Sequence, residues 1–232
     1  MKPLRNALTC LATIALAAST IAAVAPGASA TTRDPSAGLP TLTELRSARV
    51  KLSDLPTSYR RDYSGDGSSS TTSSSSDPTC SKKLDELNKD DSGSTAAREA
   101  KASYRLDKTF GPFVGTSVAV WRTKAPATAG IASIRSLLRA CDRWTETDAD
   151  GTKAAVRLSR LPMPALGTER IAFRARITVH QGALVITARA DFAAVRVRNA
   201  VAAVNLISFG AADGVDLVDL TRLSTDRLKA VL

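Results

Sequence analysis

The chain alternates between segments whose apolar residues recur every three or four positions and segments in which they recur every second position. The first spacing predicts amphipathic helices and the second predicts half-buried strands. Helices are expected to begin at Thr41, where Glu44 completes a capping box, and at Asp77, whose side chain can cap the next turn. Two further helices are expected after Pro126 and after Asp216.

The clearest strand pattern is a hairpin with its turn at Gln181-Gly182. Its apolar residues then face one another in five pairs: Val179 and Leu184, Ile177 and Ile186, Ala175 and Ala188, Phe173 and Ala190, and Ile171 and Phe192. After Phe192 the apolar positions change parity, which predicts a β-bulge near Ala193-Ala194. A turn at Arg198-Asn199 leads into a further strand, and two earlier strands contain Tyr104 with Leu106 and residues 116–122, separated by a break at 110–115.

Strands in runs, with helices at intervals and without strand–helix–strand alternation, predict an α+β fold with an antiparallel sheet flanked by helices. We expect a single domain over residues 41–232, preceded by a disordered leader at 31–40. The Ser/Thr-rich stretch at 64–77 is interpreted as a loop inside this domain. Only 33 residues lie between position 30 and Ser64, too few for a separate core. Its hydroxyls could also accept O-linked sugar.

The first 30 residues have the pattern of a secretory signal peptide. Lys2 and Arg5 precede an apolar run at 7–25, and a small-x-small cleavage pattern follows at 28–30. An uncleaved transmembrane anchor is the alternative. After removal of residues 1–30, no segment is apolar enough to span a bilayer, so we expect a secreted protein, extracellular or associated with the cell wall.

Charge narrows the choice of partner. The net charge is +10 and falls to +8 without the signal peptide, which contains two basic residues and no acidic residue. A basic exported protein is attracted to anionic lipid head groups and anionic wall polymers. Plain solubility is the alternative explanation. Nucleic acid is not expected, because aromatic residues make up only 4% of the chain and none is spaced to stack bases.

Two cysteines, Cys80 and Cys141, remain after signal removal. An even number in an exported protein predicts one disulfide. Cys80 shares a predicted helical face with Leu84 and Leu87, and Cys141 continues the apolar stripe of the helix after Pro126. A bond between them would pin the two helices together.

Few residues suggest catalysis. His180 is the only histidine and is interpreted as an exposed residue beside the hairpin turn; no G-x-S-x-G motif and no zinc-ligand spacing occur. We therefore expect neither an enzyme nor a cofactor. An extracellular hydrolase with an unrecognised carboxylate site is the alternative.

Residues 146–157 partly match a calcium-binding loop at Asp148, Asp150 and Gly151. The position that should supply a bidentate glutamate is Arg157, so we expect a turn between two strands and no metal site.

The predicted hairpin places Arg170, Arg174, Arg176 and Arg189 on the face opposite the apolar pairs, together with Asp191. Guanidinium groups on one sheet face can bind a carboxylate, a phosphate or an anionic polymer. The alternative is a solvated face, or one whose charges are paired with acids of the same protein.

Several segments resemble the extracytoplasmic PknH-like sensor domain family of actinobacteria. These are "LSDLPTSY", "VAVWRT…SIRSLLRAC", "PALGTERIAFRA" and "FAAVRVRNAV". The resemblance implies an antiparallel sheet flanked by helices, disulfides and a sensor or binding role without catalysis. This chain would be a free-standing secreted member that binds an unidentified small or anionic ligand in the cell envelope. It differs by having Arg198-Asn199 at the usual glycine turn and one possible disulfide.

Overall fold

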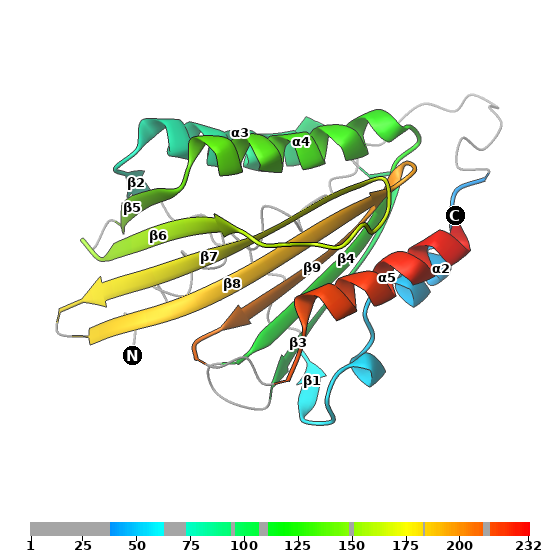
Figure 1. The fold of residues 1–232 in the computed structure, drawn as a ribbon. Helices are drawn as coiled ribbons and strands as arrows, with labels where there is room; N and C mark the ends of the chain where they lie inside the picture. The colour runs from blue at the N-terminus through cyan, green and yellow to red at the C-terminus, as the bar shows by residue number, and fades with distance from the viewer. Residues whose placement is uncertain are drawn as a thin grey trace, which may run out of the picture.

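The computed structural model describes residues 38–62, 73–93, 96–106, 111–148, 151–182, 184–210 and 214–232. The predicted signal peptide and residues 31–37 of the predicted leader lie outside the described residues. The remainder forms one antiparallel sheet with helices on both faces, which confirms the predicted α+β class (Figure 1).

The sheet has nine strands in the order β1-β3-β4-β9-β8-β7-β6-β5-β2, and every neighbouring pair is antiparallel. The strands are β1 (Tyr59–Arg61), β2 (Ser73–Ser75), β3 (Arg98–Leu106), β4 (Phe113–Val120), β5 (Arg143–Asp148), β6 (Lys153–Arg160), β7 (Glu169–Gln181), β8 (Leu184–Val197) and β9 (Ala200–Ser208). The helices are α2 (Leu42–Ala48), the 3-10 turn η1 (Leu52–Asp54), α3 (Pro78–Gly93), α4 (Lys124–Ala140) and α5 (Leu217–Val231).

The helices cover different halves of the two faces. Helices α3 and α4 lie side by side over one face, whereas α2 and α5 pack against the other (Figure 1). The core under α3 and α4 includes Trp144, Val156 and Ile177. The core under α2 and α5 includes Val118 from β4 and Val195 from β8. The face of β5–β7 that points away from α3 and α4 has no described helix against it.

Strand β8 passes between the two layers and is buried on both sides near its end. Phe192 and Ala194 belong to the core under α4, while Ala193 and Val195 face the core of α2 and α5. The β7–β8 register runs without interruption from Gln181↔Leu184 to Glu169↔Arg196. The predicted β-bulge at Ala193-Ala194 is therefore wrong, because the apolar parity changes where a second helical layer begins.

The predicted hairpin has the correct faces and the wrong partners. Val179 lies opposite Ile186 instead of Leu184, and Phe173 lies opposite Phe192 instead of Ala190. The Phe173 and Phe192 rings are in contact, with centroids 5.1 Å apart. A shift by two residues leaves every side chain on its original face, so alternation alone cannot distinguish the two registers.

The predicted helix starts are confirmed with small shifts. The Thr41 Oγ1 accepts from the Glu44 N–H, and Asp77 Oδ1 accepts from the N–H of Thr79 at 2.8 Å. At α5, Asp216 Oδ1 accepts from the N–H groups of Val218 and Asp219. Helix α4 begins at Lys124, two residues before Pro126, since proline is tolerated in a first helical turn.

The boundaries of two predicted irregular segments change. Pro40, assigned to the leader, is buried, and its carbonyl accepts a 2.8 Å hydrogen bond from Arg98. Of the Ser/Thr-rich stretch, residues 64–72 lie outside the described residues. Its next part, Ser73–Ser75, forms the edge strand β2 paired with β5.

The predicted disulfide between Cys80 and Cys141 is confirmed, with a Cα–Cα distance of 5.5 Å. Cys80 lies in the first turn of α3. Cys141 is the residue at the C-terminal end of α4, where its N–H donates to the Leu137 carbonyl at 2.8 Å. Both cysteines are buried in the core under the two helices. The bond therefore fixes α3 to α4 at the end of the pair nearest β5.

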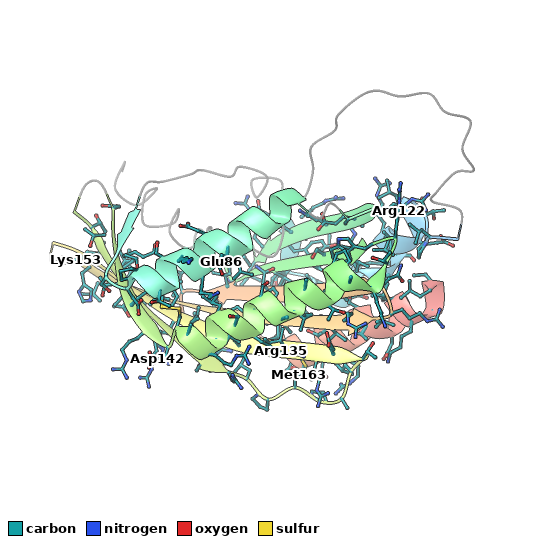
Figure 2. All side chains as sticks on the ribbon, turned by 90° about the horizontal axis from the view of Figure 1, so that it is seen from above. Glu86, Arg122, Arg135, Asp142, Lys153 and Met163 are labelled. Atoms are coloured by element: carbon teal, nitrogen blue, oxygen red, sulfur yellow. A yellow bond between two sulfur atoms is a disulfide. The ribbon has the colours of Figure 1, made fainter. Side chains whose placement is uncertain are left out.

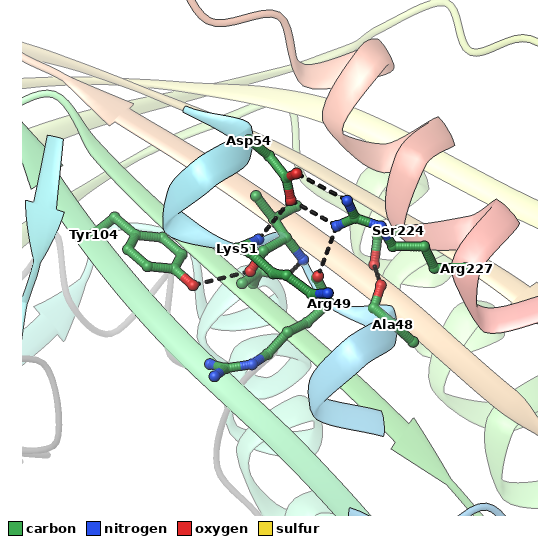
Figure 3. Close-up of polar contacts among 9 residues, drawn as sticks. Ala48, Arg49, Lys51, Asp54, Tyr104, Ser224 and Arg227 are labelled. Atoms are coloured by element: carbon green, nitrogen blue, oxygen red, sulfur yellow. Dashed lines mark hydrogen bonds and ion pairs between the residues drawn. The ribbon is translucent and has the colours of Figure 1, made fainter. Parts of the chain in front are cut away.

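A polar network fixes α2 and η1 to α5 on the other face (Figure 3). Arg227 donates to both carboxylate oxygens of Asp54, at 2.6 and 2.8 Å. Ser224 Oγ donates to the Ala48 carbonyl at 3.0 Å, and Tyr104 Oη donates to the Val50 carbonyl at 2.9 Å. The side-chain hydrogen bonds from Arg227 hold the pKa of Asp54 below its usual range, although burial opposes them. This ion pair joins segments 173 residues apart in sequence.

Replacing both cysteines, as C80S/C141S, should lower the free energy of unfolding by about 2–4 kcal/mol, because the bond closes a loop with a separation of 61 residues. Urea denaturation followed by circular dichroism measures the change. A difference below about 0.5 kcal/mol would contradict a structural role for the bond.

The D54N variant should lose about 1–3 kcal/mol of stability at neutral pH, because it leaves Arg227 without its carboxylate partner. The folded-state pKa of Asp54 is lowered, so its contribution is present above roughly pH 4 and is lost as the pH falls through the folded-state value. The stabilities of D54N and wild type should therefore converge in acid. D226N, at the exposed pair with Lys229, is the control and should change stability by less than about 0.5 kcal/mol.

Candidate functional site

The uncovered face of β5–β7, together with the hairpin end of β8, is the most distinctive surface of the described chain. Along β6, the buried residues Ala154, Val156 and Leu158 alternate with exposed residues that point to the opposite side. These exposed residues begin with Lys153 and include Arg157. From Phe173 to His180, β7 shows the same alternation between buried residues and exposed or half-buried ones. One side of this half-sheet thus forms the core, and the other side meets solvent.

Four arginines from four neighbouring strands stand in one line across this solvent face. Arg143 lies opposite Arg157, Arg157 lies opposite Arg176, and Arg176 lies opposite Arg189. Neighbouring strands are about 4.8 Å apart, so the line extends over about 14 Å. We call these four residues the arginine row.

Other lines of cross-strand neighbours run parallel to the arginine row. Toward the hairpin end, the first of these lines is neutral and the second is mixed. The next line consists of Thr145, Ala155, Thr178 and Thr187, and the line beyond it contains Lys153, His180 and Val185. On the other side of the arginine row, Ser159, Arg174 and Asp191 lie opposite one another in succession. We call this set of residues the basic face: Arg143, Thr145, Lys153, Ala155, Arg157, Ser159, Arg174, Arg176, Thr178, His180, Val185, Thr187, Arg189 and Asp191.

Asp191 is the only acidic residue of the basic face and is held by two arginines. Arg174 donates from Nε and Nη2 at 2.6 and 3.0 Å, and Arg189 donates from the same two atoms at 2.9 and 2.5 Å. The Asp191 side chain is only 3% exposed. Burial alone would raise the pKa of Asp191, but the hydrogen bonds from Arg174 and then Arg189 outweigh it and lower the pKa. Asp191 is therefore ionised at neutral pH and offsets part of the charge around it.

The rest of the arginine row is less compensated. Arg157 and Arg176 are exposed and have no hydrogen-bond or ion-pair partner among the described residues. Arg143 is 3.4 Å from Asp142, but both side chains are about three-quarters exposed (76% and 77%). Such an exposed pair contributes little energy and is readily exchanged for another anion. The middle of the arginine row thus offers two guanidinium groups to solvent.

Three of the four predicted anion-binding arginines come together, and the fourth does not. Arg174, Arg176 and Arg189 lie side by side on the basic face. Arg170 lies at the start of β7, where its Nε donates to the Met163 carbonyl at 3.1 Å. Its own carbonyl lies 3.5 Å from the guanidinium of Arg135 on α4. Figure 2 shows Met163 and Arg135 far from Lys153, which lies at one end of the sheet.

No pattern in the sequence indicated that Arg143, Arg157 and Lys153 belong to this surface, because their position depends on how β5 and β6 pair with β7. The alternation of Lys153, Ala155, Arg157 and Ser159 with buried residues was the available signal for the exposed side of β6. The structure pairs Arg157 with both neighbouring arginines in register.

The partial calcium pattern at 146–157 belongs to the β5–β6 hairpin. Asp148 Oδ1 accepts from the Thr152 N–H at 2.8 Å, and Glu146 accepts from the indole N–H of Trp144 at 3.0 Å. Positions 149–150 lie outside the described residues. This agrees with the expected turn between two strands. In the part of the chain that the structure describes, His, Cys, Asp and Glu side chains form no group of three that could hold a metal ion.

His180 is exposed and lies opposite Val185 within the β7–β8 pair, near the hairpin end. Among the described helices, none has both the length and the apolar composition to cross a bilayer.

Comparison with known proteins identifies the fold. No protein-family profile matches the chain, and no curated protein sequence is similar to it. Among solved structures, the fold is similar to that of the extracellular domain of PknH from Mycobacterium tuberculosis, with a TM-score of 0.57 and 12% sequence identity. The match covers 82% of this chain and 98% of that chain. At this identity the likeness shows a shared fold alone.

The D191N variant should lose about 1–3 kcal/mol of stability at neutral pH, because Arg174 and Arg189 would lose their shared carboxylate and repel Arg176. Chemical denaturation at low salt measures the loss, and added salt should reduce it by screening the arginines. Unchanged stability at low salt would show that Asp191 does not compensate these charges.

Proposed function

We propose that this protein is a secreted, non-catalytic, sensor-like binding protein of the cell envelope that holds an anionic ligand on its basic face. The observation that carries the proposal is the arginine row, whose central members Arg157 and Arg176 are exposed and have no partner among the described residues.

Guanidinium groups are suited to this role. Each offers a planar fork of N–H donors that matches two oxygens of a phosphate or carboxylate. Arg157 and Arg176 would give up only water on binding, whereas Arg174 and Arg189 would have to share the ligand with Asp191. We therefore assign the main ligand contacts to Arg157 and Arg176, with Arg143 beside them.

The shape of the surface favours an extended ligand. Small molecules are usually bound in concave, mostly apolar sites. The basic face is instead the solvent side of a sheet, with guanidinium groups distributed over about 14 Å. An anionic polymer or an array of head groups can contact several of them at once.

Three observations support an extracellular setting. The N-terminal 30 residues have a signal-peptide pattern. The Cys80–Cys141 disulfide is typical of proteins in oxidising compartments. The fold is similar to that of an extracellular domain. The alternative of a hydrolase finds no support in the contacts of the described residues.

Inorganic polyphosphate is a suitable probe for this function. Wild type should bind it at low salt, with affinity falling as salt rises, and R157Q/R176Q should weaken binding at least tenfold. Fluorescence anisotropy of labelled polyphosphate measures the affinity.

The matched control is R122Q/R139Q, which removes the same charge from exposed arginines beside and within α4. Figure 2 shows Arg122 at the end of the molecule opposite Lys153. This variant should bind within twofold of wild type. Equal losses for both pairs would contradict a specific basic face, and release of phosphate from the probe would contradict a non-catalytic role.

A further inference from the structure

The tip of the β7–β8 hairpin exposes two apolar side chains, Val185 on the side of the basic face and Leu184 on the opposite side of the sheet, because successive residues of a strand point to opposite faces. Leu184 is 46% exposed and Val185 is 56% exposed, and only two other large hydrophobic residues of the described chain are comparably exposed. Figure 1 shows β7 and β8 extending past the ends of α3 and α4 at this point. Neither residue belongs to a core cluster of the described chain.

The apolar tip is continuous with the basic face. Val185 lies opposite His180, which in turn lies opposite Lys153, so all three share one line across the solvent side. Arg189 follows four residues later on the same face of β8, about 13 Å away. Between them, the hydroxyls of Thr178 and Thr187 are 3.4 Å apart. Along β8, the solvent side thus changes from apolar at Val185 to hydroxylated at Thr187 and cationic at Arg189.

We propose that this surface docks onto an anionic lipid bilayer, with Leu184 and Val185 entering the interface and the arginine row meeting the phosphate groups. The inference rests on the proposed function and specifies the anionic ligand as the head groups of a lipid bilayer. Single exposed hydrophobic residues are common, but two on opposite sides of one projecting hairpin tip, beside a cationic surface, form a combination suited to a tip that enters the bilayer interface edge-on.

A bilayer accounts for the apolar tip better than a soluble polyanion does. A polymer such as polyphosphate can neutralise Arg157 and Arg176, but it offers no apolar environment to Leu184 or Val185. A bilayer supplies both, with anionic groups at its surface and acyl chains a few ångströms below. Each basic side chain near an anionic surface strengthens binding about fivefold.

Vesicle co-sedimentation tests the proposal with the exported protein. The vesicles contain either phosphatidylcholine alone or phosphatidylcholine with one quarter phosphatidylglycerol. Wild type should bind only the anionic vesicles. R157Q/R176Q should weaken this binding about 25-fold, R157K/R176K should retain most of it, and R122Q/R139Q should remain within twofold of wild type.

The tip variant L184T/V185T distinguishes insertion of the tip into a bilayer from anion binding by the basic face. Threonine keeps the strand preference of these positions. This variant should bind anionic vesicles at least fivefold more weakly than wild type and should bind polyphosphate equally well. All variants share one N-terminus, so residues 1–30 cannot cause a difference between them.

Three results would overturn the inference. Wild type that binds polyphosphate but not anionic vesicles would exclude membrane docking and leave the proposed function intact. Unchanged vesicle binding by L184T/V185T would exclude insertion of the tip. If R157Q/R176Q retained full binding of both polyphosphate and vesicles, the proposed function would fail as well.

Discussion

The arrangement of the molecule depends on the burial of strand β8 on both of its faces. Its apolar residues first pack under α3 and α4, and from Ala193 onward they also pack against the layer formed by α2 and α5. Each pair of helices covers only part of one face. The two pairs therefore lie on opposite faces, over different halves of the sheet. One consequence is that the outer side of β5–β7 has no described helix upon it and can carry charged residues.

Charge on this outer side would destabilise the sheet without internal compensation. Arg176 and Arg189 lie directly opposite each other, an arrangement that is unfavourable for like charges. Asp191 relieves it by binding Arg189 and Arg174 from a buried position. The compensation is incomplete, because one carboxylate serves two guanidinium groups and Arg157 is not among them. Folding favours neutralising this surface, whereas the proposed ligand binding requires free positive charge. Asp191 neutralises Arg174 and Arg189 and leaves Arg157 and Arg176 exposed.

The sequence was most informative where the determining residues are neighbours in the chain. The helix caps at Thr41 and Asp77 and the start of the last helix after Asp216 depend on contacts within three residues, and they were predicted correctly. The disulfide followed from two cysteines on apolar positions. The inward and outward faces of β7 and β8 followed from alternation, which has a period of two residues. That same period explains why the strand partners were displaced by two positions.

What could not be predicted depends on contacts between distant segments. The apparent bulge at Ala193-Ala194 reflected the arrival of α5, whose position no local pattern specifies. The arginine row required the pairing of β5 with β6 and of β6 with β7, so Arg143 and Arg157 were not recognised as neighbours of Arg176. Likewise, the ion pair between Arg227 and Asp54 joins segments 173 residues apart, and no local pattern indicates it. The candidate site was thus only partly visible before its strands were placed in register.

The two outermost strands have a consequence for the behaviour of the protein among its own copies. An edge strand presents unpaired backbone groups to which another sheet can attach. Here both edges, β1 and β2, are only three residues long, with arginines on the first and serines on the second. Short edges of charged or small polar residues are a recurrent protection against the growth of one sheet onto the next. Strands β1 and β2 themselves therefore offer few backbone groups to which a second sheet could pair.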